Sequence, residues 1–539
     1  MSSLVRMPLW LAIAWIGIMA IGAFVRLSRM DYLGPWMDEG MYLLAGRNAF
    51  EPALDFAWLN GWKFGYPLLA HAAETVAGSW IGARYLNAAI GLATVVIAHA
   101  WARSVIFDMH RTDSRARNEL RGLAGLALLS FAMPLVFTSR LATYDALAFL
   151  WFALALYFGR RARTVAETTP ESRAIHVFHA ASAFALFAGV LSKYVVILYL
   201  PLFVADGLLL SNHRRRWLAS ALAPLAVLTL VFAIFWGADF MVGTASTAVD
   251  SVKSDWRGIT GHTASLIGAP LLLAVVGLVA APRGHRREAL LLLWGALILY
   301  AFYLWAGHVQ ALIKLMSFSL ILLAPLFGIG FLQLVNLATL GVLRRTGKLR
   351  PLVTALGLVA LVPLAIQSTL WVQPGWKFGW WHDRGWVVVA ETAVHDIVKE
   401  RYGRPARIWS TRPFEDMAMN PDLQAGMNLQ LDRSDVSSPY VEPSRIPAVA
   451  ASMFKIDFEV VLGLIERREL DMYVVLDGDF QQPERDRLDQ IGSSHAYVLL
   501  GIDDRPSDTP FGVSRRPSRA RVIVKAELFG PLLERGLVR

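Results

Sequence analysis

The protein is a chain of 539 residues, of which 55% are hydrophobic and only 17% are charged. Soluble domains carry about 25% charged residues, so this deficit and the mean hydropathy of +0.45 indicate an integral membrane protein. The absence of cysteine excludes disulfides, thiolate metal sites and cysteine nucleophiles. The net charge of +10 is spread over short loops, without the aromatic-interleaved basic stripe that nucleic-acid binding needs.

Eleven apolar segments are long enough to cross a bilayer, which takes about 20 mostly apolar residues. The N-terminal segment is not followed by a cleavage site, so we interpret it as a retained helix and not as a removed signal peptide. The fifth and sixth segments are so close that averaging hydropathy over a strict window would merge them into one span. The predicted spans are 9–26, 84–106, 122–138, 141–159, 176–191, 194–212, 217–236, 263–281, 288–306, 315–336 and 352–372.

Every second connection between these spans is rich in basic residues, as cytoplasmic loops are. The residues concerned are Arg103, Arg111, Arg115, Arg117 and Arg121; Arg160, Arg161 and Arg163; Arg214, Arg215 and Arg216; Arg283, Arg286 and Arg287; and Arg344, Arg345, Lys348 and Arg350. We therefore expect a cytoplasmic N-terminus. The Ala/Arg/Gly-rich composition is associated with GC-rich bacterial genomes, so the bacterial inner membrane is the expected location.

Beyond the last span the pattern changes to that of a water-soluble α/β domain. A helix is predicted at 387–402, and strands are predicted at 406–411, 471–477, 495–502 and near 520–528. No glycine-rich phosphate loop, metal-ligand spacing or nucleophile elbow occurs there. The prediction is an α-helical membrane domain at 1–372 and an extracytoplasmic α/β domain at 373–539, which would act as a lid or as a docking module.

The first outer loop, at about 27–83, contains an adjacent acidic pair, Asp38 and Glu39. Neighbouring residues on a helix point about 100° apart, so the two carboxylates would take separate roles, one facing a reacting centre and one orienting its surroundings. A structural interpretation of Asp38 is equally open. It precedes a helical pattern and could be the N-cap of that helix.

Two more charged residues stand out at the outer membrane boundary. Lys63 has aromatic neighbours, and it is either an anion-binding group or a lysine that snorkels beside belt aromatics. Asp145 lies about one turn inside the fourth span, where charged residues are costly and usually face the bundle interior. Alternatively Asp145 complements the positive helix N-terminus, with Thr143 or Ser139 as caps. Arg140 fits a juxtamembrane anchor.

Several motifs follow one another on the predicted outer side. Asp38 and Glu39 come a dozen residues after the first span, a stretch from Lys63 to Pro67 follows, and Arg84 opens the second span in GARYLNAAIGLATV. The fourth span, LATYDALAFLWFALALYF, carries Asp145 at its outer end. A later segment, GVLSKYVVILYLP, places a lysine in a turn between spans.

This order of motifs resembles the GT-C glycosyltransferases. It is similar in particular to the protein O-mannosyltransferases and the bacterial aminoarabinose transferases of lipid A (glycosyltransferase family 39). The turn Ser192-Lys193-Tyr194 corresponds to the family's Thr-Lys-Gly turn, with Tyr194 in place of glycine. Lys314 stands where the family has a late Lys-x-x-Arg-Tyr motif, and the Arg-Tyr is missing here. The resemblance covers about 200 residues of spaced motifs.

The resemblance implies transfer of a sugar, with inversion, from a polyprenyl-phosphate donor to an extracytoplasmic glycan, lipid or protein acceptor. Asp38 would be the general base, with Glu39 and Asp145 as the other catalytic carboxylates. The implied donor-phosphate ligands are the cationic residues Lys63, Arg84, Lys193 and Lys314. Some relatives bind a divalent ion near the lipid phosphate, so a metal is an open possibility. Membrane lipids are the other expected partner, and nucleic acid is not.

Three other functions compete with this interpretation. An intramembrane Asp145 also suits a secondary transporter, but transporters usually show internal repeats and mid-membrane sites, whereas the polar residues here gather at the outer ends of the spans. A polymer ligase or flippase-like envelope protein would lack donor-phosphate chemistry. A non-catalytic receptor would use the C-terminal domain to bind its partner.

Overall fold

A computed structural model describes eleven stretches of the chain: 8–28, 30, 37–47, 65–210, 214–249, 255–307, 311–343, 385–410, 458–476, 496–504 and 519–538. The chain divides into two compact units. The first comprises residues 1–28, 84–238 and 251–372, and the second comprises 29–83, 239–250 and 373–539.

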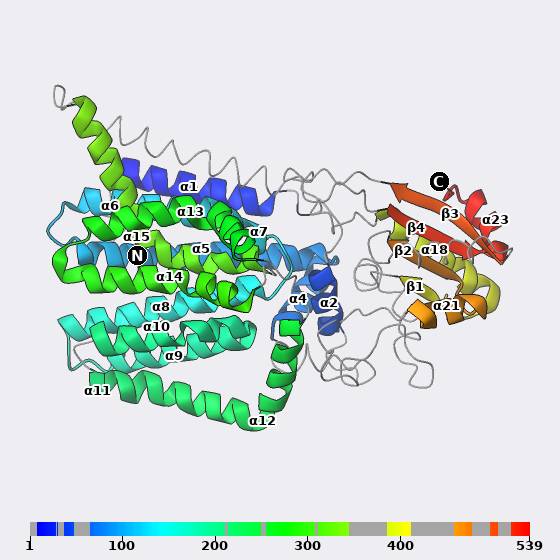
Figure 1. Cartoon of the computed structure of the whole chain (residues 1–539), viewed down its shortest axis with the longest axis horizontal. Coiled ribbons are helices and arrows are strands. Elements are labelled where there is room, and N and C mark those ends of the chain that lie inside the picture. The colour runs from blue at the N-terminus through cyan, green and yellow to red at the C-terminus, as the bar shows by residue number, and fades with distance from the viewer. Residues whose placement is uncertain are drawn as a thin grey trace. The chain divides into compact units, whose positions relative to one another are not determined.

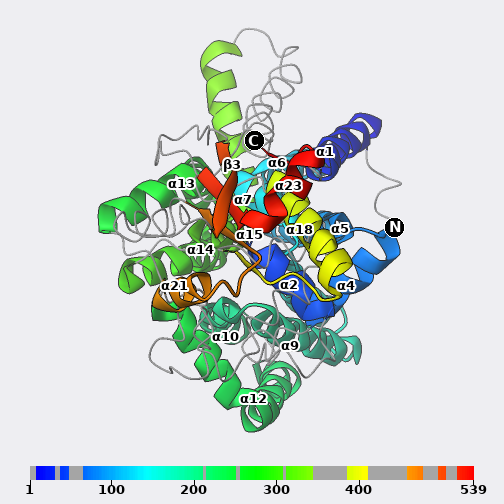
Figure 2. The ribbon, with the colours of Figure 1, turned by 90° about the vertical axis from the view of Figure 1, so that its right-hand side faces the viewer.

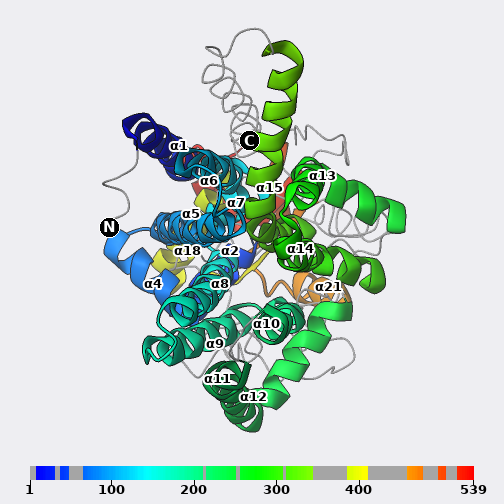
Figure 3. The same ribbon diagram turned by 90° about the vertical axis from the view of Figure 1, so that its left-hand side faces the viewer.

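The first unit is a bundle of helices around α15 (Leu312–Leu343), whose yellow-green last turns rise out of the bundle in Figure 3. Nearly all of the most apolar stretch of α15 is buried, and its Phe318 packs against Phe149, Phe152 and Tyr199. The other helices are α1 (Leu9–Leu27), α5 (Ile81–Met109), α6 (Arg115–Phe131), α7 (Met133–Ser139), α8 (Asp145–Thr168), α9 (Ala174–Ser192), α10 (Leu200–Ala205), α11 (Arg214–Trp217), α12 (Ala223–Val249), α13 (Trp256–Ala280) and α14 (Arg286–Ala306). Short 3₁₀ or π turns connect some of them, namely η2 (Tyr194–Tyr199), η3 (Asp206–Leu210), η4 (Leu218–Leu222) and η5 (Arg283–His285).

Helices α13 and α15 lie against each other at glycines. A Cβ atom on Gly277 would collide with the carbonyl oxygen of Leu326, and one on Gly330 would collide with that of Leu273. Inside a bilayer lipid tails are as apolar as leucine, so helices associate through close backbone packing at small residues. These glycines therefore hold α13 on the central helix.

Seven described segments are long and apolar enough to cross a membrane, and an eighth is formed if the bent pair α6–α7 counts as one span. The seven are Leu9–Leu27, Ile81–Met109, Ala174–Ser192, Arg214–Phe235, Trp256–Ala280, Arg283–Ala306 and Leu312–Leu337. The chain is a multi-pass membrane protein. The predicted span 141–159 falls mainly in α8, which continues beyond the span through an arginine-rich end to Thr168. The predicted span 194–212 falls in an apolar segment, Tyr194–Leu209, that is shorter than a full span. The predicted span 352–372 lies outside the described residues, so the count of eleven stays a prediction.

The predicted third span is broken between α6 and α7, whose axes differ by 51°. The break leaves carbonyl groups at the end of α6 without helix donors, and Pro134, which lacks an N–H, cannot supply one to the Ser130 oxygen. Arg26, at the end of α1, donates to two of them, at 3.1 Å to the Leu129 oxygen and 2.6 Å to the Ser130 oxygen. In return Arg140 donates to the Val25 oxygen at 2.6 Å. Arg26 of α1 thus satisfies the end of α6, and Arg140, which follows α7, satisfies the end of α1.

Three of the connections predicted to be cytoplasmic meet at one end of this bundle. Arg111 pairs with Glu167 at 2.7 Å, which joins the α5–α6 connection to the end of α8. Arg160 of α8 forms ion pairs with both Asp108 of α5 and Glu288 of α14. The basic residues of these three connections therefore share one end of the bundle. Which face of the membrane that end occupies stays a prediction.

The second unit combines helices with a four-stranded sheet (Figures 1 and 2). Its helices are α2 (Met37–Arg47), α4 (Gly65–Ala77), α18 (Gly385–Tyr402), α21 (Phe458–Glu466) and α23 (Ala526–Glu534). The strands are β1 (Ile408–Ser410), β2 (Met472–Leu476), β3 (Tyr497–Asp504) and β4 (Arg519–Lys525), in the order β1-β2-β4-β3. Strand β1 is parallel to β2, and β4 is antiparallel to both β2 and β3. Each strand overlaps a predicted one, although β4 ends at Lys525 and α23 occupies the following residues.

A buried carboxylate ties three strands of this sheet together. Asp471, which precedes β2 and is 1% exposed, accepts hydrogen bonds from Arg404 at 2.6 Å, from the Arg407 N–H at 2.8 Å and from Lys525 at 3.0 Å. Burial raises the pKa of Asp471, but these positive and N–H groups outweigh burial and hold its pKa below the usual value. Since the folded pKa is depressed, the stabilisation is present above the unfolded pKa and is lost as the pH falls through the folded pKa.

We predict that Asp471→Asn lowers the free energy of unfolding of the sheet by about 2 kcal/mol at pH 7, because two partly buried cations and one backbone N–H lose a charged acceptor. Pulsed hydrogen–deuterium exchange of the full-length protein in detergent would measure this. The difference between variant and wild type should shrink as the equilibration pH falls below about 4. The matched control is Arg467→Gln, which removes an exposed ion pair with Glu469 and should change little. Equal protection in Asp471→Asn and wild type would contradict the prediction.

Candidate functional site

The end of the bundle opposite the arginine network contains a buried cluster of one carboxylate and two ammonium groups. Asp145, the first residue of α8, is 1% exposed. Lys193 Nζ forms an ion pair with Asp145 Oδ1, and Lys314 Nζ lies 3.5 Å from Asp145 Oδ2. The three side chains come from three different segments and sum to one positive charge. Three of the residues singled out in the sequence are therefore neighbours in the structure.

Lys193 is held in place on both sides of its backbone. It ends α9 in an extended conformation (φ −151°, ψ 112°). Its N–H donates to the Gly189 oxygen at 2.8 Å, and its carbonyl accepts from the Val196 N–H at 3.0 Å. Its Nζ also lies 4.7 Å from the ring centroid of Tyr144, a cation–π contact. The ammonium is thus oriented by protein groups.

Lys314 occupies a position that is electrostatically unfavourable for a cation. It lies in the first turn of α15, and this helix begins directly after Ala311, whose φ is 58°. The N-terminal end of a helix already carries a partial positive charge, and burial to 4% exposure adds a desolvation penalty. The partial charge of the helix end and the desolvation penalty both disfavour a lysine here, so its presence indicates a role in binding an anion. The Asp145 carboxylate is one such anion.

The turn before Asp145 is fixed by a residue that the sequence analysis did not single out. Asn87 of α5 is fully buried, and its Nδ2 donates to the carbonyl oxygens of Leu141 and Thr143, the latter at 2.7 Å. The Thr143 hydroxyl in turn donates to Asp145 Oδ2 at 2.9 Å. Thr143 therefore bonds the carboxylate itself, and α8 has no side-chain cap. A polar residue inside the apolar run RYLNAAIG was the available signal for Asn87.

The structure describes three of the other four predicted site residues. Arg84 is fully buried in α5, three residues before Asn87 and hence on the same side of that helix. Asp38 and Glu39 lie in the first turn of α2, in the second unit, where Glu39 is fully buried and Asp38 is half-buried. Lys63 lies outside the described residues.

Helix α2 is anchored to α4 within the second unit. Arg47, at the end of α2, pairs with Glu74 of α4, with Nε 2.9 Å from Oε2. The rings of Tyr42 and Tyr66 meet edge to face with centroids 5.9 Å apart. These contacts give the helix that carries the acidic pair a fixed partner.

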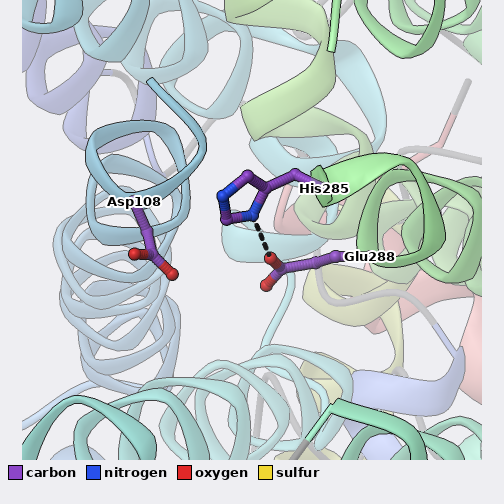
Figure 4. A group of neighbouring side chains, drawn as sticks. All are labelled: Asp108, His285 and Glu288. Atoms are coloured by element: carbon purple, nitrogen blue, oxygen red, sulfur yellow. Dashed lines mark ion pairs between the residues drawn. The ribbon is translucent and has the colours of Figure 1, made fainter. Parts of the chain in front are cut away.

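One group of metal-type ligands occurs among the described residues, and it lies at the arginine-rich end of the bundle. Figure 4 shows Asp108, His285 and Glu288, each with a ligand atom within 4.8 Å of the others. The oxygen atoms are already paired, because Arg160 contacts both carboxylates and Arg163 lies 3.0 Å from Glu288. Guanidinium groups thus occupy the places where a cation would bind, so this group does not fit a metal ion. Asp108 and Asn87 lie near opposite ends of α5, so it is also remote from Asp145.

We predict that Asp145→Asn lowers the melting temperature of the detergent-solubilised protein, because two buried ammonium groups lose their carboxylate at a cost of about 3–5 kcal/mol. Adding Lys193→Met should restore part of the loss in melting temperature. The double variant removes both charges of the Asp145–Lys193 ion pair, whereas Asp145→Asn alone leaves the Lys193 ammonium buried without this carboxylate. Thermal unfolding followed by size-exclusion chromatography would measure both. The control is Glu171→Gln, at an ion pair whose carboxylate is 87% exposed. A melting temperature for Asp145→Asn equal to that of wild type would refute the pairing.

Comparison with known proteins gives similarity in structure and none in sequence. No family model and no curated protein sequence matches the chain. The apo crystal structure of ArnT from Cupriavidus metallidurans superposes with a TM-score of 0.59 at 15% identity, over 96% of this chain and 99% of ArnT. The oligosaccharyltransferase AglB from Archaeoglobus fulgidus, in complex with an inhibitory peptide and a dolichol-phosphate, gives a TM-score of 0.53 at 12% identity, over 86% of this chain and 69% of AglB.

An apo structure of the Archaeoglobus fulgidus enzyme agrees, with a TM-score of 0.54 at 11% identity over 87% of this chain and 69% of that one. At such low identities the likeness establishes the fold. ArnT covers both units of this chain nearly from end to end. The predicted helical membrane fold is therefore confirmed, and the protein shares the fold of ArnT and AglB.

Proposed function

We propose that the protein is an inverting glycosyltransferase that moves a sugar from a polyprenyl-phosphate donor to an extracytoplasmic glycan, lipid or protein acceptor. The observation that carries the proposal is the buried Asp145–Lys193–Lys314 cluster, whose net positive charge suits a lipid-linked phosphate. Two findings support it. The chain has a fold found in glycosyltransferases, and AglB, which shares that fold, has been crystallised with a dolichol-phosphate.

In the proposed reaction the acceptor oxygen attacks the anomeric carbon of the sugar from the face opposite the phosphate. The bond between the anomeric carbon and the phosphate oxygen breaks, and the polyprenyl phosphate leaves with the electron pair. The phosphate changes from a monoanionic diester to a dianionic monoester, so negative charge grows on it during the reaction. Preorganised cations at a water-poor site stabilise such charge. Lys193 and Lys314 would supply them, together with Lys63 and Arg84.

Asp38 would accept the proton of the acceptor hydroxyl, and Glu39 would orient the groups around it. The exposures of the two residues fit this division, since Asp38 is half-buried and Glu39 is fully buried. General-base assistance contributes about 10² to 10⁴ in rate. If the acceptor were itself a phosphate, no proton would need to leave, and Asp38 would only position it. Asp145 would keep Lys193 and Lys314 in place.

The proposed location is the bacterial inner membrane, with a cytoplasmic N-terminus and with residues 373–539 outside. In this orientation the arginine-rich end of the bundle faces the cytoplasm, as the positive-inside rule requires. The Asp145 cluster then lies at the outer face, where lipid-linked sugars take the place of nucleotide sugars. The outer domain would act as a lid or dock the acceptor.

We predict that the purified protein releases free polyprenyl phosphate from at least one member of a panel of polyprenyl-phosphate sugars. Asp38→Asn should slow the release at least about 100-fold, because the amide cannot accept a proton. The matched control is Asp396→Asn, at an exposed carboxylate of α18 in the same unit, and it should keep the wild-type rate.

Two outcomes would count against the proposal. Normal turnover by Asp38→Asn would remove Asp38 as the base for a hydroxyl acceptor. Uptake of a substrate into liposomes, without turnover of any donor on the panel, would instead identify a transporter.

A further inference from the structure

The arginine-rich end of the bundle carries basic residues that take no part in its ion-pair network. Arg286 and Arg287 lie in the first turn of α14, and Arg214 and Arg215 lie in α11. All four are exposed, and none forms an ion pair with a residue that the structure describes. The N-terminal end of α14 adds its own partial positive charge. These four residues, which we call the basic rim, therefore offer positive charge to an external anion.

A cavity of about 80 Å³ lies inside the bundle next to the basic rim. Its walls come mainly from α8, α9, α10, η3, α11 and α14, which pack against one another (Figure 3). Trp217 of α11 and Leu291 of α14 line it. Residues three or four apart share one face of a helix, so Arg214 stands one turn from Trp217 and Arg287 stands one turn from Leu291. Two walls of the cavity thus end in an exposed arginine of the basic rim.

The lining of the cavity changes from charged to apolar with depth. Nearer the helix ends, Arg160 pairs with Glu288 and Arg163 pairs with Asp206. The Asp206 carboxylate is 46% exposed, so the cavity reaches the surface there. About one turn or more further into the bundle the lining residues are Phe152, Leu156, Leu202, Phe203 and Leu292. Because the lining arginines are paired with lining carboxylates, the interior suits an uncharged, mainly apolar group, whereas the basic rim suits an anion.

We infer that this end of the bundle binds an anionic glycerophospholipid, with its phosphate on Arg214 and Arg287 and part of one acyl chain in the cavity. Such a lipid has the same layers as the site, namely a charged phosphate, a polar glycerol ester region and an apolar chain. Guanidinium groups bind phosphate through two parallel hydrogen bonds, and basic pockets between membrane helices bind anionic lipid headgroups.

The size of the cavity limits how much of the lipid enters it. An engineered apolar cavity of about 150 Å³ binds benzene, so a cavity of about 80 Å³ accepts only a few carbon atoms of one chain. The rest of the lipid would lie along the outside of the bundle. The inference does not rest on the proposed transferase, because it concerns the end of the bundle opposite Asp145.

The test is the affinity of the full-length protein in detergent for radiolabelled phosphatidylglycerol, measured by equilibrium binding, with phosphatidylcholine as the lipid without net charge. We expect phosphatidylglycerol to bind at least about tenfold more tightly. The double variant Arg214→Gln/Arg287→Gln should raise its dissociation constant about 30-fold, because two basic residues lose their attraction to the phosphate. Both residues are exposed, so the variant should fold as wild type does. Wild-type affinity in this variant would overturn the inference.

The matched control is Arg161→Gln/Arg173→Gln, which removes the same charge from the same end of the bundle. Both residues are exposed, and neither lines the cavity. Arg161 lies 6.0 Å from the ring centroid of Phe178, and Arg173 directly precedes α9. We expect the dissociation constant to change less than about twofold. Equal losses in the two double variants would show a general attraction to a basic surface and would refute a site at the basic rim.

Two further measurements test the part of the acyl chain. Ala155→Leu adds three carbon atoms at a position that lines the cavity, and it should weaken phosphatidylglycerol binding about fivefold while phosphatidylcholine binding stays weak. Glycerol 3-phosphate, which has the phosphate and no chain, should not displace the bound lipid even at a hundredfold excess. Displacement at that excess would identify an anion site that needs no lipid and would contradict the inference, even if Ala155→Leu does not fold.

Discussion

The constraint on which the bundle depends is the burial of the Asp145 carboxylate together with two ammonium groups. Removing these charges from water costs several kcal/mol for each ion, and mutual attraction recovers that cost only when the geometry is good. Here the geometry requires α8, the turn after α9 and the first turn of α15 to meet at one point. Apolar residues of similar size would join the same three segments at lower cost. Stability alone therefore does not explain why charged residues stand at this point.

At the opposite end of the bundle, charged residues form ion pairs that join neighbouring helices. There Arg160 contacts Asp108 and Glu288, and Arg163 contacts Glu288 and Asp206. Guanidinium groups have planar, fixed donors that match carboxylates and they are always charged. Lysines, with mobile point charges, occupy the Asp145 end instead. At the Asp145 end two lysines are paired with one carboxylate, whereas at the arginine end Arg160 and Arg163 are paired with three carboxylates, those of Asp108, Glu288 and Asp206.

The sequence predicted the features that follow from composition and missed those that follow from tertiary contact. Apolar length was enough to locate spans, and the cost of a charge inside a span was enough to single out Asp145. The break at Pro134 was not predicted, because it requires Arg26, more than a hundred residues away in sequence, to satisfy the freed carbonyls. Asn87 was missed for the same reason, since its partner Thr143 is 56 residues further on.

The break between α6 and α7 and the turn before Asp145 have one requirement in common, which is that backbone carbonyl groups within the membrane need hydrogen-bond donors. In lipid every carbonyl freed by a break must find a donor from the protein, and at the break between α6 and α7 that donor is the Arg26 side chain. Arg140 holds the last turn of α1 through the Val25 oxygen, only a few residues before the turn that Asn87 fastens and that ends at Asp145. One short stretch, from Arg140 to Asp145, therefore holds both the last turn of α1 and the buried carboxylate, so changes there should affect the packing of α1 and the Asp145 cluster together.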